Sequence, residues 1–394
     1  MGMRKATSAL VGLLLAGAAA TPAYAETVRS QQWHLDAMKA DEIWKVTTGK
    51  GITVAVIDTG VNQIPELEGQ VLPGKAFPVG DAEVGRDNDY YGHGTGMAGM
   101  IAGTGKHPSG DGAYGLAPGV KILPIRVPDM LEGADTPSIV AAIRYAADSD
   151  AKVINISMGL PSKPEEDAGR AVAVKYALSK GKLIFAAVGN YGDSTNELAY
   201  PAGTPGVVGV GAADVDGKPT KESMHGPQVD VAAPGMDIVS SCKAKSGLCK
   251  THGTSDASAL ASASAALLWS AHPDWTNNQV LRVLLNTLGK PTDGVERNDY
   301  VGYGIVRPRV ALQTPGDPGP ADVYPLPDLA AAADAAKKPS ASADAKAPDA
   351  AASKPAAQAE EKKTGSVLSW IALGLGACVL IGGAVAVVVV RRNR

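Results

Sequence analysis

The sequence has few cysteines, few aromatic residues and almost no net charge. Among its 394 residues are three cysteines and two phenylalanines, and 37 basic residues nearly balance 40 acidic ones. This balance, with only 5% aromatic residues, gives no electrostatic reason to expect a nucleic acid as partner. The scattered histidines show no metal-ligand spacing, so we expect no metal and no other cofactor. These are four of the six histidines, namely His34, His107, His225 and His272.

Both ends of the chain carry features of targeting segments. Residues 1–25 combine two early basic residues, an apolar run and the sequence Ala-Tyr-Ala, which is typical of a cleaved signal peptide. Residues 366–390 are uncharged and long enough to cross a bilayer as one helix, and arginines follow in residues 391–394. Positive residues stay on the cytoplasmic side. We therefore expect a cytoplasmic basic tail, a transmembrane helix and an extracytoplasmic domain at the cell membrane.

Two regions of different composition lie between these ends. Residues 314–365 are rich in Pro, Ala, Asp and Lys and have few large apolar side chains, which predicts a disordered linker. Residues 26–313 are sufficient for one large domain with a sizeable core. We expect this domain to carry the function.

Two cysteines are left for the exported part of the chain, because Cys378 lies in the expected membrane segment. Cys242 and Cys249 could form a disulfide or remain free thiols. The oxidising compartment and the short Gly-containing loop between them favour the disulfide.

Short β-branched runs alternate with longer Ala-rich stretches through residues 26–313, which predicts an α/β fold with a doubly wound parallel sheet and helices on both faces. The runs are so continuously apolar that we expect interior strands. Expected strands are 52–57, 121–127, 152–156, 183–188 and 207–211. Expected helices are 95–103, 137–147, 165–179, 256–271 and 277–288, with N-caps at Thr136 and Thr276.

Three residues could carry chemistry, although each has an ordinary structural explanation. Asp58 follows an expected strand, where Asp is usually a turn former or helix cap. His93 opens a small-residue helix, and a single His there is more often a surface or core residue. Ser255 opens another helix, where it could be a plain N-cap. Competing hydroxyls nearby are Ser258, Ser262 and Ser264.

The three residues become informative as a set. Asp58, His93 and Ser255 all fall near the carboxyl edge of one expected parallel sheet, where open α/β folds bind ligands. An acid, a base and a nucleophile are the components of a serine hydrolase. Residues 32–308 resemble the subtilisin family through the ordered motifs VAVIDTG, GHGTGMAG, INISMG, AAVGN and HGTS. The resemblance implies a subtilisin-like fold and serine endopeptidase activity on proteins or peptides.

The resemblance also implies roles for individual residues. Ser255 would attack the scissile carbonyl, His93 would transfer protons and Asp58 would orient the imidazole. Asn190, in the motif AAVGN, matches the oxyanion-hole amide, with an Asx turn as the alternative. An extended peptide would pair beside the segment Ser157, Met158 and Gly159. One of its side chains would fill a pocket bounded by Ala187, Val188 and Gly189.

The chain also departs from the subtilisin pattern. The family usually has His at Gly96, Pro at Ser258 and a small residue at His252, which puts the level of activity in question. Asp87 and Asp89 could bind a cation, but they lack calcium-loop spacing, so a solvated acidic loop is expected. Only a handful of residues lie between residue 25 and the segment QQWHLDAMKADEIW, so we expect no folded prodomain ahead of the catalytic domain.

The expected signal peptide, linker and anchor are similar to the architecture of the mycosins, membrane-anchored subtilases associated with type VII secretion in actinobacteria. This resemblance implies a secretion membrane complex as partner. Two functions then compete, an endopeptidase acting on secreted proteins and a structural subunit that stabilises the complex. An esterase fits less well, because esterases use a different motif and residue order.

Overall fold

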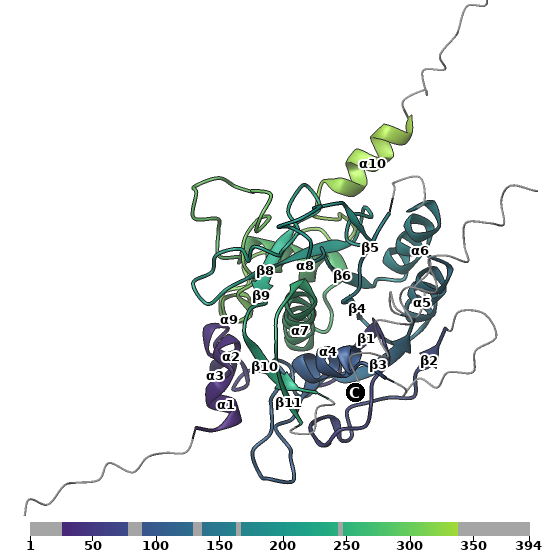
Figure 1. Ribbon diagram of the computed structural model, residues 1–394. Coiled ribbons are helices and arrows are strands. Elements are labelled where there is room, and N and C mark those ends of the chain that lie inside the picture. Colours follow the sequence, from purple (N-terminus) through teal and green to yellow (C-terminus); the bar gives the residue numbers. More distant parts are fainter. Residues whose placement is uncertain (1–25, 78–88, 129–135, 163–166, 243–246, 338–394) are drawn as a thin grey trace, which may run out of the picture. The chain divides into compact units, whose positions relative to one another are not determined.

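The computed structural model describes residues 26–77, 89–128, 136–162, 167–242 and 247–337 (Figure 1). The expected signal peptide (1–25), transmembrane helix (366–390) and basic tail (391–394) lie outside the described residues and stay predictions. Within the described residues, no helix is long and apolar enough to span a membrane.

A seven-stranded parallel sheet forms the centre of the domain, in the order β2-β3-β1-β4-β6-β8-β9. Its strands are β1 (Thr53–Asp58), β2 (Lys75–Ala76), β3 (Lys121–Arg126), β4 (Val153–Ile156), β6 (Leu183–Ala187), β8 (Val208–Ala213) and β9 (Val231–Pro234). The five predicted strands are the five interior strands, so that prediction is confirmed. The two edge strands were not predicted.

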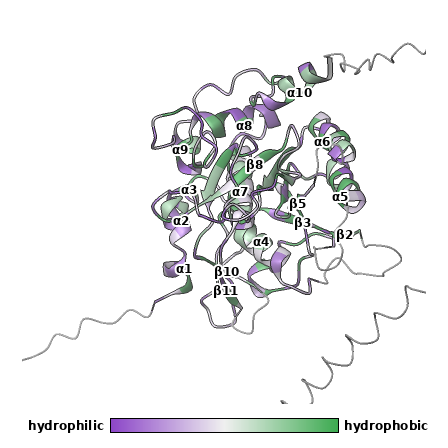
Figure 2. Ribbon diagram, turned by 45° about the horizontal axis from the view of Figure 1, so that its top comes forward, coloured by the Kyte–Doolittle hydropathy of each residue, from purple (hydrophilic) through white to green (hydrophobic). Residues whose placement is uncertain are grey.

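The interior strands are apolar throughout because both faces of the sheet are covered. In β1, Val54 and Val56 belong to one hydrophobic core, whereas Ala55 and Ile57 belong to the other. Side chains alternate between the two faces of a strand, so a strand between two cores needs continuous apolar sequence. Figure 2 shows hydrophobic residues concentrated on the central strands.

Long helices cover both faces of the sheet. They are α4 (His93–Ala102), α5 (Thr136–Asp148), α6 (Ala168–Ser179), α7 (Thr254–Ala271) and α8 (Asn277–Asn286). Helices α5 and α6 pack together, and α7 packs on α4 and the central strands (Figure 1). All five predicted helices are present, with shifted ends. Thr276 caps α8 in a capping box with Gln279, as expected, whereas Thr136 lies inside α5.

Several short elements were not predicted. They are the helices α1 (Val28–Gln31), α2 (Trp33–Ala37), α3 (Ala40–Ile43) and α9 (Pro308–Gln313), the 3-10 turn Pro65–Leu67, and the pairs β5 (Leu160–Pro161) with β7 (Ala199–Tyr200) and β10 (Ile238–Ser241) with β11 (Leu248–Thr251). A disulfide joins Cys242 to Cys249 at the β10–β11 hairpin, with Cα atoms 5.8 Å apart, and confirms the predicted pairing.

Residues 314–337 differ from the disordered linker that we expected to begin at residue 314. The guanidinium of Arg282 donates to the carbonyl oxygens of Pro318 (2.8 Å), Pro320 (2.9 Å) and Val323. Leu326 is 3% exposed in the core, and helix α10 (Asp328–Lys337) follows. Side chains at the start of α8 make further hydrogen bonds to the segment, from Thr276 and Asn278 to the carbonyl of Ala321 and from Gln279 to that of Gly319, so this Pro-rich segment is attached to the domain. The rest of the expected linker lies outside the described residues.

Candidate active site

The site lies where β1 ends and α4 and α7 begin. Asp58 is the last residue of β1, His93 the first of α4 and Ser255 the second of α7. A Cβ atom on Gly94 would lie 2.2 Å from the carbonyl oxygen of Gly60 and 3.0 Å from the Cβ of Asp58. Only glycine therefore lets the start of α4 approach the end of β1 so closely.

Asp58 and His93 form a hydrogen-bonded pair. The Nδ1 of His93 lies 2.7 Å from the Oδ1 of Asp58, and the same oxygen accepts the backbone N–H of Thr59 at 2.8 Å. The Asp58 side chain is 1% exposed and the His93 side chain 38%. The carboxylate can therefore hold the ring by Nδ1 and leave Nε2 to face the solvent-accessible cleft.

The charges around His93 favour its protonated form. Burial acts against the imidazolium, but the carboxylate of Asp58, helped by those of Asp256 and Asp89, outweighs it and raises the pKa of His93 to about 9. A neutral ring is needed to accept a proton. The site is consequently expected to gain activity as the pH rises.

Asp89 is buried and hydrogen-bonded to the residues around His93. The prediction of a solvated acidic loop is therefore wrong at this position. Asp89 is 0% exposed. Its Oδ1 accepts from the Thr59 hydroxyl and the Gly92 N–H, both at 2.8 Å, and its Oδ2 from the N–H (2.8 Å) and hydroxyl (2.5 Å) of Thr95. Asp89 thus joins the end of β1 to the first turn of α4, on both sides of His93. Asp87 lies outside the described residues.

Ser255 is distinguished from its neighbouring hydroxyls by exposure to the cleft. Ser258 and Ser262 are buried and donate to the Oδ1 of Asn155 at 2.9 and 3.1 Å, and buried Ser264 donates to the carbonyl of Leu260 at 2.8 Å. These hydroxyls serve helix packing, which also explains why a serine is accommodated at position 258. Ser255 is the hydroxyl of this group that lines the cleft.

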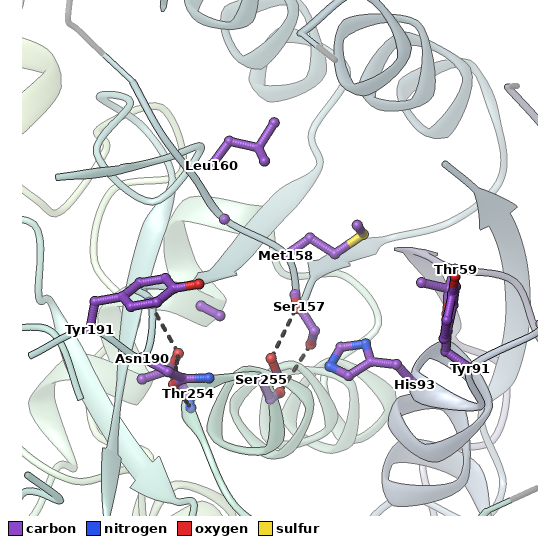
Figure 3. Close-up of a pocket in the computed structure, with 13 residues that line it drawn as sticks. Thr59, Tyr91, His93, Ser157, Met158, Leu160, Asn190, Tyr191, Thr254 and Ser255 are labelled. Carbon is purple, nitrogen blue, oxygen red and sulfur yellow. Dashed lines mark hydrogen bonds between the residues drawn. The ribbon is translucent and has the colours of Figure 1, made fainter. Parts of the chain in front are cut away.

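The hydroxyl of Ser255 donates to the carbonyl oxygen of Ser157 at 2.9 Å, and the hydroxyl of Ser157 donates to the carbonyl of Ser255 at 3.0 Å. Figure 3 shows the ring of His93 directed toward these two serines. A hydroxyl has one proton, so transfer to His93 requires rotation of the Ser255 side chain away from Ser157.

Asn190 is held by its carbonyl oxygen. Its Oδ1 accepts from the N–H and the hydroxyl of Thr254 at 2.9 and 3.0 Å, and the Thr254 hydroxyl accepts from the N–H of Gly189 at 3.1 Å. With Oδ1 occupied, the amide NH₂ points toward Ser255 (Figure 3). A donor fixed beside a nucleophile can stabilise a developing oxyanion.

A cleft of about 460 Å³ contains most of the predicted site residues. The residues lining it include His93, Ser255, Asn190, Ser157, Met158, Gly159, Ala187 and Gly189.

Val188 differs from our expectation, because it is 0% exposed and belongs to a hydrophobic core. Tyr91, Leu160 and Tyr191 also line the cleft and were missed. Gly189 has φ +108°, a backbone conformation that favours glycine, and a Cβ there would also displace the sulfur of Met224, which would lie 2.3 Å away.

A second cleft, of about 620 Å³, adjoins the first and contains Asp256 and His252. Asp256 is 2% exposed, and its Oδ2 accepts from the hydroxyl of Thr251 at 2.8 Å. The ring of His252 is 62% exposed and its Nδ1 lies 2.7 Å from the Oε1 of Glu222. Hydrogen bonding to that carboxylate raises the pKa of His252.

Comparisons with known proteins place this chain in a family. The model of the subtilase family, Peptidase_S8, matches residues 49–304. The chain belongs to the subtilase family. It is 39% identical over 268 residues to a thermophilic serine proteinase of Bacillus sp. (strain AK1), a match that covers 68% of this chain and 63% of that relative. Subtilisin Savinase of Lederbergia lenta is 32% identical, with 68% and 92% of the two chains covered.

Solved structures add a second similarity. MycP1 from Mycobacterium smegmatis is 30% identical with a TM-score of 0.65, and the match covers 75% of this subtilase and 87% of MycP1. MycP3 from the type VII (ESX-3) secretion system is 33% identical with a TM-score of 0.62, covering 72% and 88%. Both are mycosins, so the predicted resemblance to the subtilases and mycosins is confirmed.

Proposed function

We propose that the chain is a serine endopeptidase with Asp58, His93 and Ser255 as its catalytic triad. The contact that carries this proposal is the 2.7 Å hydrogen bond from His93 Nδ1 to the buried Asp58 carboxylate, beside a cleft that exposes Ser255. This bond fixes the tautomer in which Nε2 can accept a proton. The family match supports the same reaction.

In the proposed reaction, Ser255 rotates away from Ser157, gives its proton to His93 and attacks the scissile carbonyl. The oxyanion receives hydrogen bonds from the Asn190 amide and the Ser255 backbone N–H at the start of α7. His93 then protonates the leaving amine, and Asp58 stabilises the charged ring. Water repeats the sequence on the acyl-enzyme and regenerates the serine.

The free carbonyl of Ser157 would help to bind the substrate backbone. Once the Ser255 hydroxyl leaves it, this oxygen can accept a main-chain N–H from an extended peptide beside residues 157–159. The pocket bounded by Ala187 and Gly189 would receive the side chain before the scissile bond. Its walls are apolar, which favours an uncharged side chain.

We further propose that the enzyme is anchored in the cell membrane by residues 366–390 and acts at a type VII secretion complex on the extracytoplasmic side. The sequence of that segment and the similarity to MycP1 and MycP3 support this. One solved MycP1 is described as an essential component of the ESX-1 system, so a stabilising role in such a complex is the second candidate.

Reaction of the purified full-length chain with a fluorophosphonate probe tests the peptidase proposal. We expect one labelled residue, Ser255, identified by mass spectrometry, and no labelling of Ser255→Ala. Ser258→Ala is the matched control, since that hydroxyl is buried and should label like wild type. Labelling of another serine, or none on folded protein, would contradict the proposed triad. Complementation of a secretion defect by Ser255→Ala would favour the stabilising role.

A further inference from the structure

The second cleft contains residues, among them Asp256 and His252, that have no role in the proposed peptidase reaction. It shares Tyr91, His93, Asn190 and Ser255 with the first cleft, so these residues form the boundary between the two. A peptide lying across Ser255 would therefore occupy both clefts. The inference below rests on the proposed function.

The position of His93 indicates which part of a substrate enters the second cleft. His93 must protonate the leaving amine, so the chain beyond the scissile bond has to extend past His93. The first cleft contains the 157–159 segment expected to bind the acyl part. The second cleft continues along α4 beyond His93, where it is lined by Gly96 and Met97. The leaving-group residues would thus lie in the second cleft.

The second cleft has a carboxylate without a cationic partner. In the parts of the chain that the structure describes, no lysine or arginine forms an ion pair with Asp256. The two histidines nearby make their hydrogen bonds to other carboxylates, His93 to Asp58 and His252 to Glu222, and act on Asp256 only through their charge. A carboxylate that is 2% exposed with a neutral hydroxyl as its hydrogen-bond donor is poorly compensated. A cation from outside would stabilise it.

The cleft that contains this carboxylate has room for a long side chain. A Cβ on Gly96 would have the carbonyl oxygen of Ser241 as its nearest neighbour, at an ordinary contact of 3.9 Å. Packing therefore does not demand glycine there, and the missing side chain leaves the cleft open. Tyr91, 55% exposed, offers a ring face at the rim for a guanidinium or an aliphatic stem.

We propose that Asp256 is a specificity-determining residue, which binds an arginine or lysine side chain of the substrate on the leaving-group side of the scissile bond. Burial raises the pKa of Asp256 to about 6. The carboxyl is therefore mostly ionised at neutral pH, and a bound cation would favour the ionised form further.

Partitioning of the acyl-enzyme between water and added amines tests this proposal in the full-length protein. A p-nitrophenyl ester of an acylated amino acid forms the acyl-enzyme. An amine then attacks its carbonyl, the ester bond to Ser255 breaks as an amide bond forms, and the proton of the amine passes through His93 to the serine oxygen. The matched amines are argininamide and citrullinamide, which have nearly the same shape but differ in charge.

We expect argininamide to be favoured over citrullinamide about tenfold at equal concentration, the effect of one charge-assisted hydrogen bond. Asp256→Asn should remove this preference and leave ester hydrolysis measurable, whereas the surface variant Asp216→Asn should retain it. Equal partitioning in wild type, or a preference that survives Asp256→Asn, would overturn the proposal.

Failure of ester hydrolysis would count against the proposed peptidase function and is a separate result. In that case saturation-transfer NMR measures binding of the same two amides to wild type and Asp256→Asn. Binding of argininamide that depends on Asp256 supports the specificity role. Binding of both amides alike, or of neither, overturns it.

Discussion

Asp89→Asn is the perturbation that most directly tests how the structure positions His93. The substitution preserves shape but replaces one carboxylate oxygen by an NH₂ group. Each oxygen of Asp89 accepts one backbone N–H and one hydroxyl. A hydroxyl can turn to accept from the new NH₂, but one backbone N–H loses its acceptor whichever way the amide is oriented. At about 1.5–3 kcal/mol for a bond to a charged group, the free energy of unfolding should fall by about that amount.

The same substitution should change the titration of His93. The Asp89 carboxylate is one of the charges that raise the pKa of His93, so its removal lowers that pKa. Activity requires the neutral ring, and the acid limb of the profile of kcat/KM against pH should move to lower pH. A residue that only stabilised the fold would leave this limb in place.

Urea unfolding and pH profiles of ester hydrolysis measure the two effects. Asp216→Asn, which removes an exposed carboxylate that is 66% accessible, is the control and should change neither. Thr59→Val removes the hydroxyl that donates to Asp89 at 2.8 Å, and it should give a smaller loss of stability. An unfolding free energy within about 1 kcal/mol of wild type, together with an unmoved acid limb, would refute this account of Asp89.

Three further outcomes follow from the site and the hairpin. Because the pKa of His93 is raised, the wild-type acid limb of kcat/KM should have its midpoint above pH 6.5, and a midpoint at or below 6.5 would contradict the charge analysis. Asn190→Ala should lower kcat about 100- to 1000-fold with little change in KM, a magnitude taken from subtilisin; an unchanged kcat would exclude the oxyanion role. Replacing Cys242 and Cys249 together by alanine should cost about 2.5 kcal/mol for a closed loop with a sequence separation of 7, about 5–10 °C in calorimetry. An unchanged melting temperature would argue against that stabilisation.

The sequence was sufficient to predict the interior of the sheet because interior strands have a strong local pattern. β1, between two cores, is apolar at successive positions. The edge strand β2 has two residues and no such pattern. The strands β10 and β11 are stabilised by pairing with each other and by the disulfide, and neither partner could be recognised alone.

The residues that the sequence pointed to and the residue that it misjudged differ in one respect, which is the presence of a local motif. Asp58, His93, Ser255 and Asn190 were selected because each lies in a short motif with glycines at fixed offsets. The fold brings His93, Ser255 and Asn190 to one cleft, and the buried Asp58 contacts His93 behind it. Asp89 has no such motif, and its role depends on donors from two separate elements. An acidic residue in a polar loop is usually solvated, so composition favoured the wrong interpretation.

Asp256 and the segment 314–337 both have surroundings that depend on residues distant in the sequence, which local sequence patterns do not show. The segment was expected to be disordered because it has few apolar residues, yet Arg282, 36 to 41 residues earlier, binds three of its carbonyl oxygens. In the sequence, Asp256 is only the first residue of the expected helix 256–271, yet the fold buries it in a cleft that also contains Ser255, with no lysine or arginine paired to it among the described residues. Local sequence reports what a residue can do by itself. Whether a charge is compensated depends on what the fold brings to it, and at Asp256 we infer that the substrate supplies the missing cation.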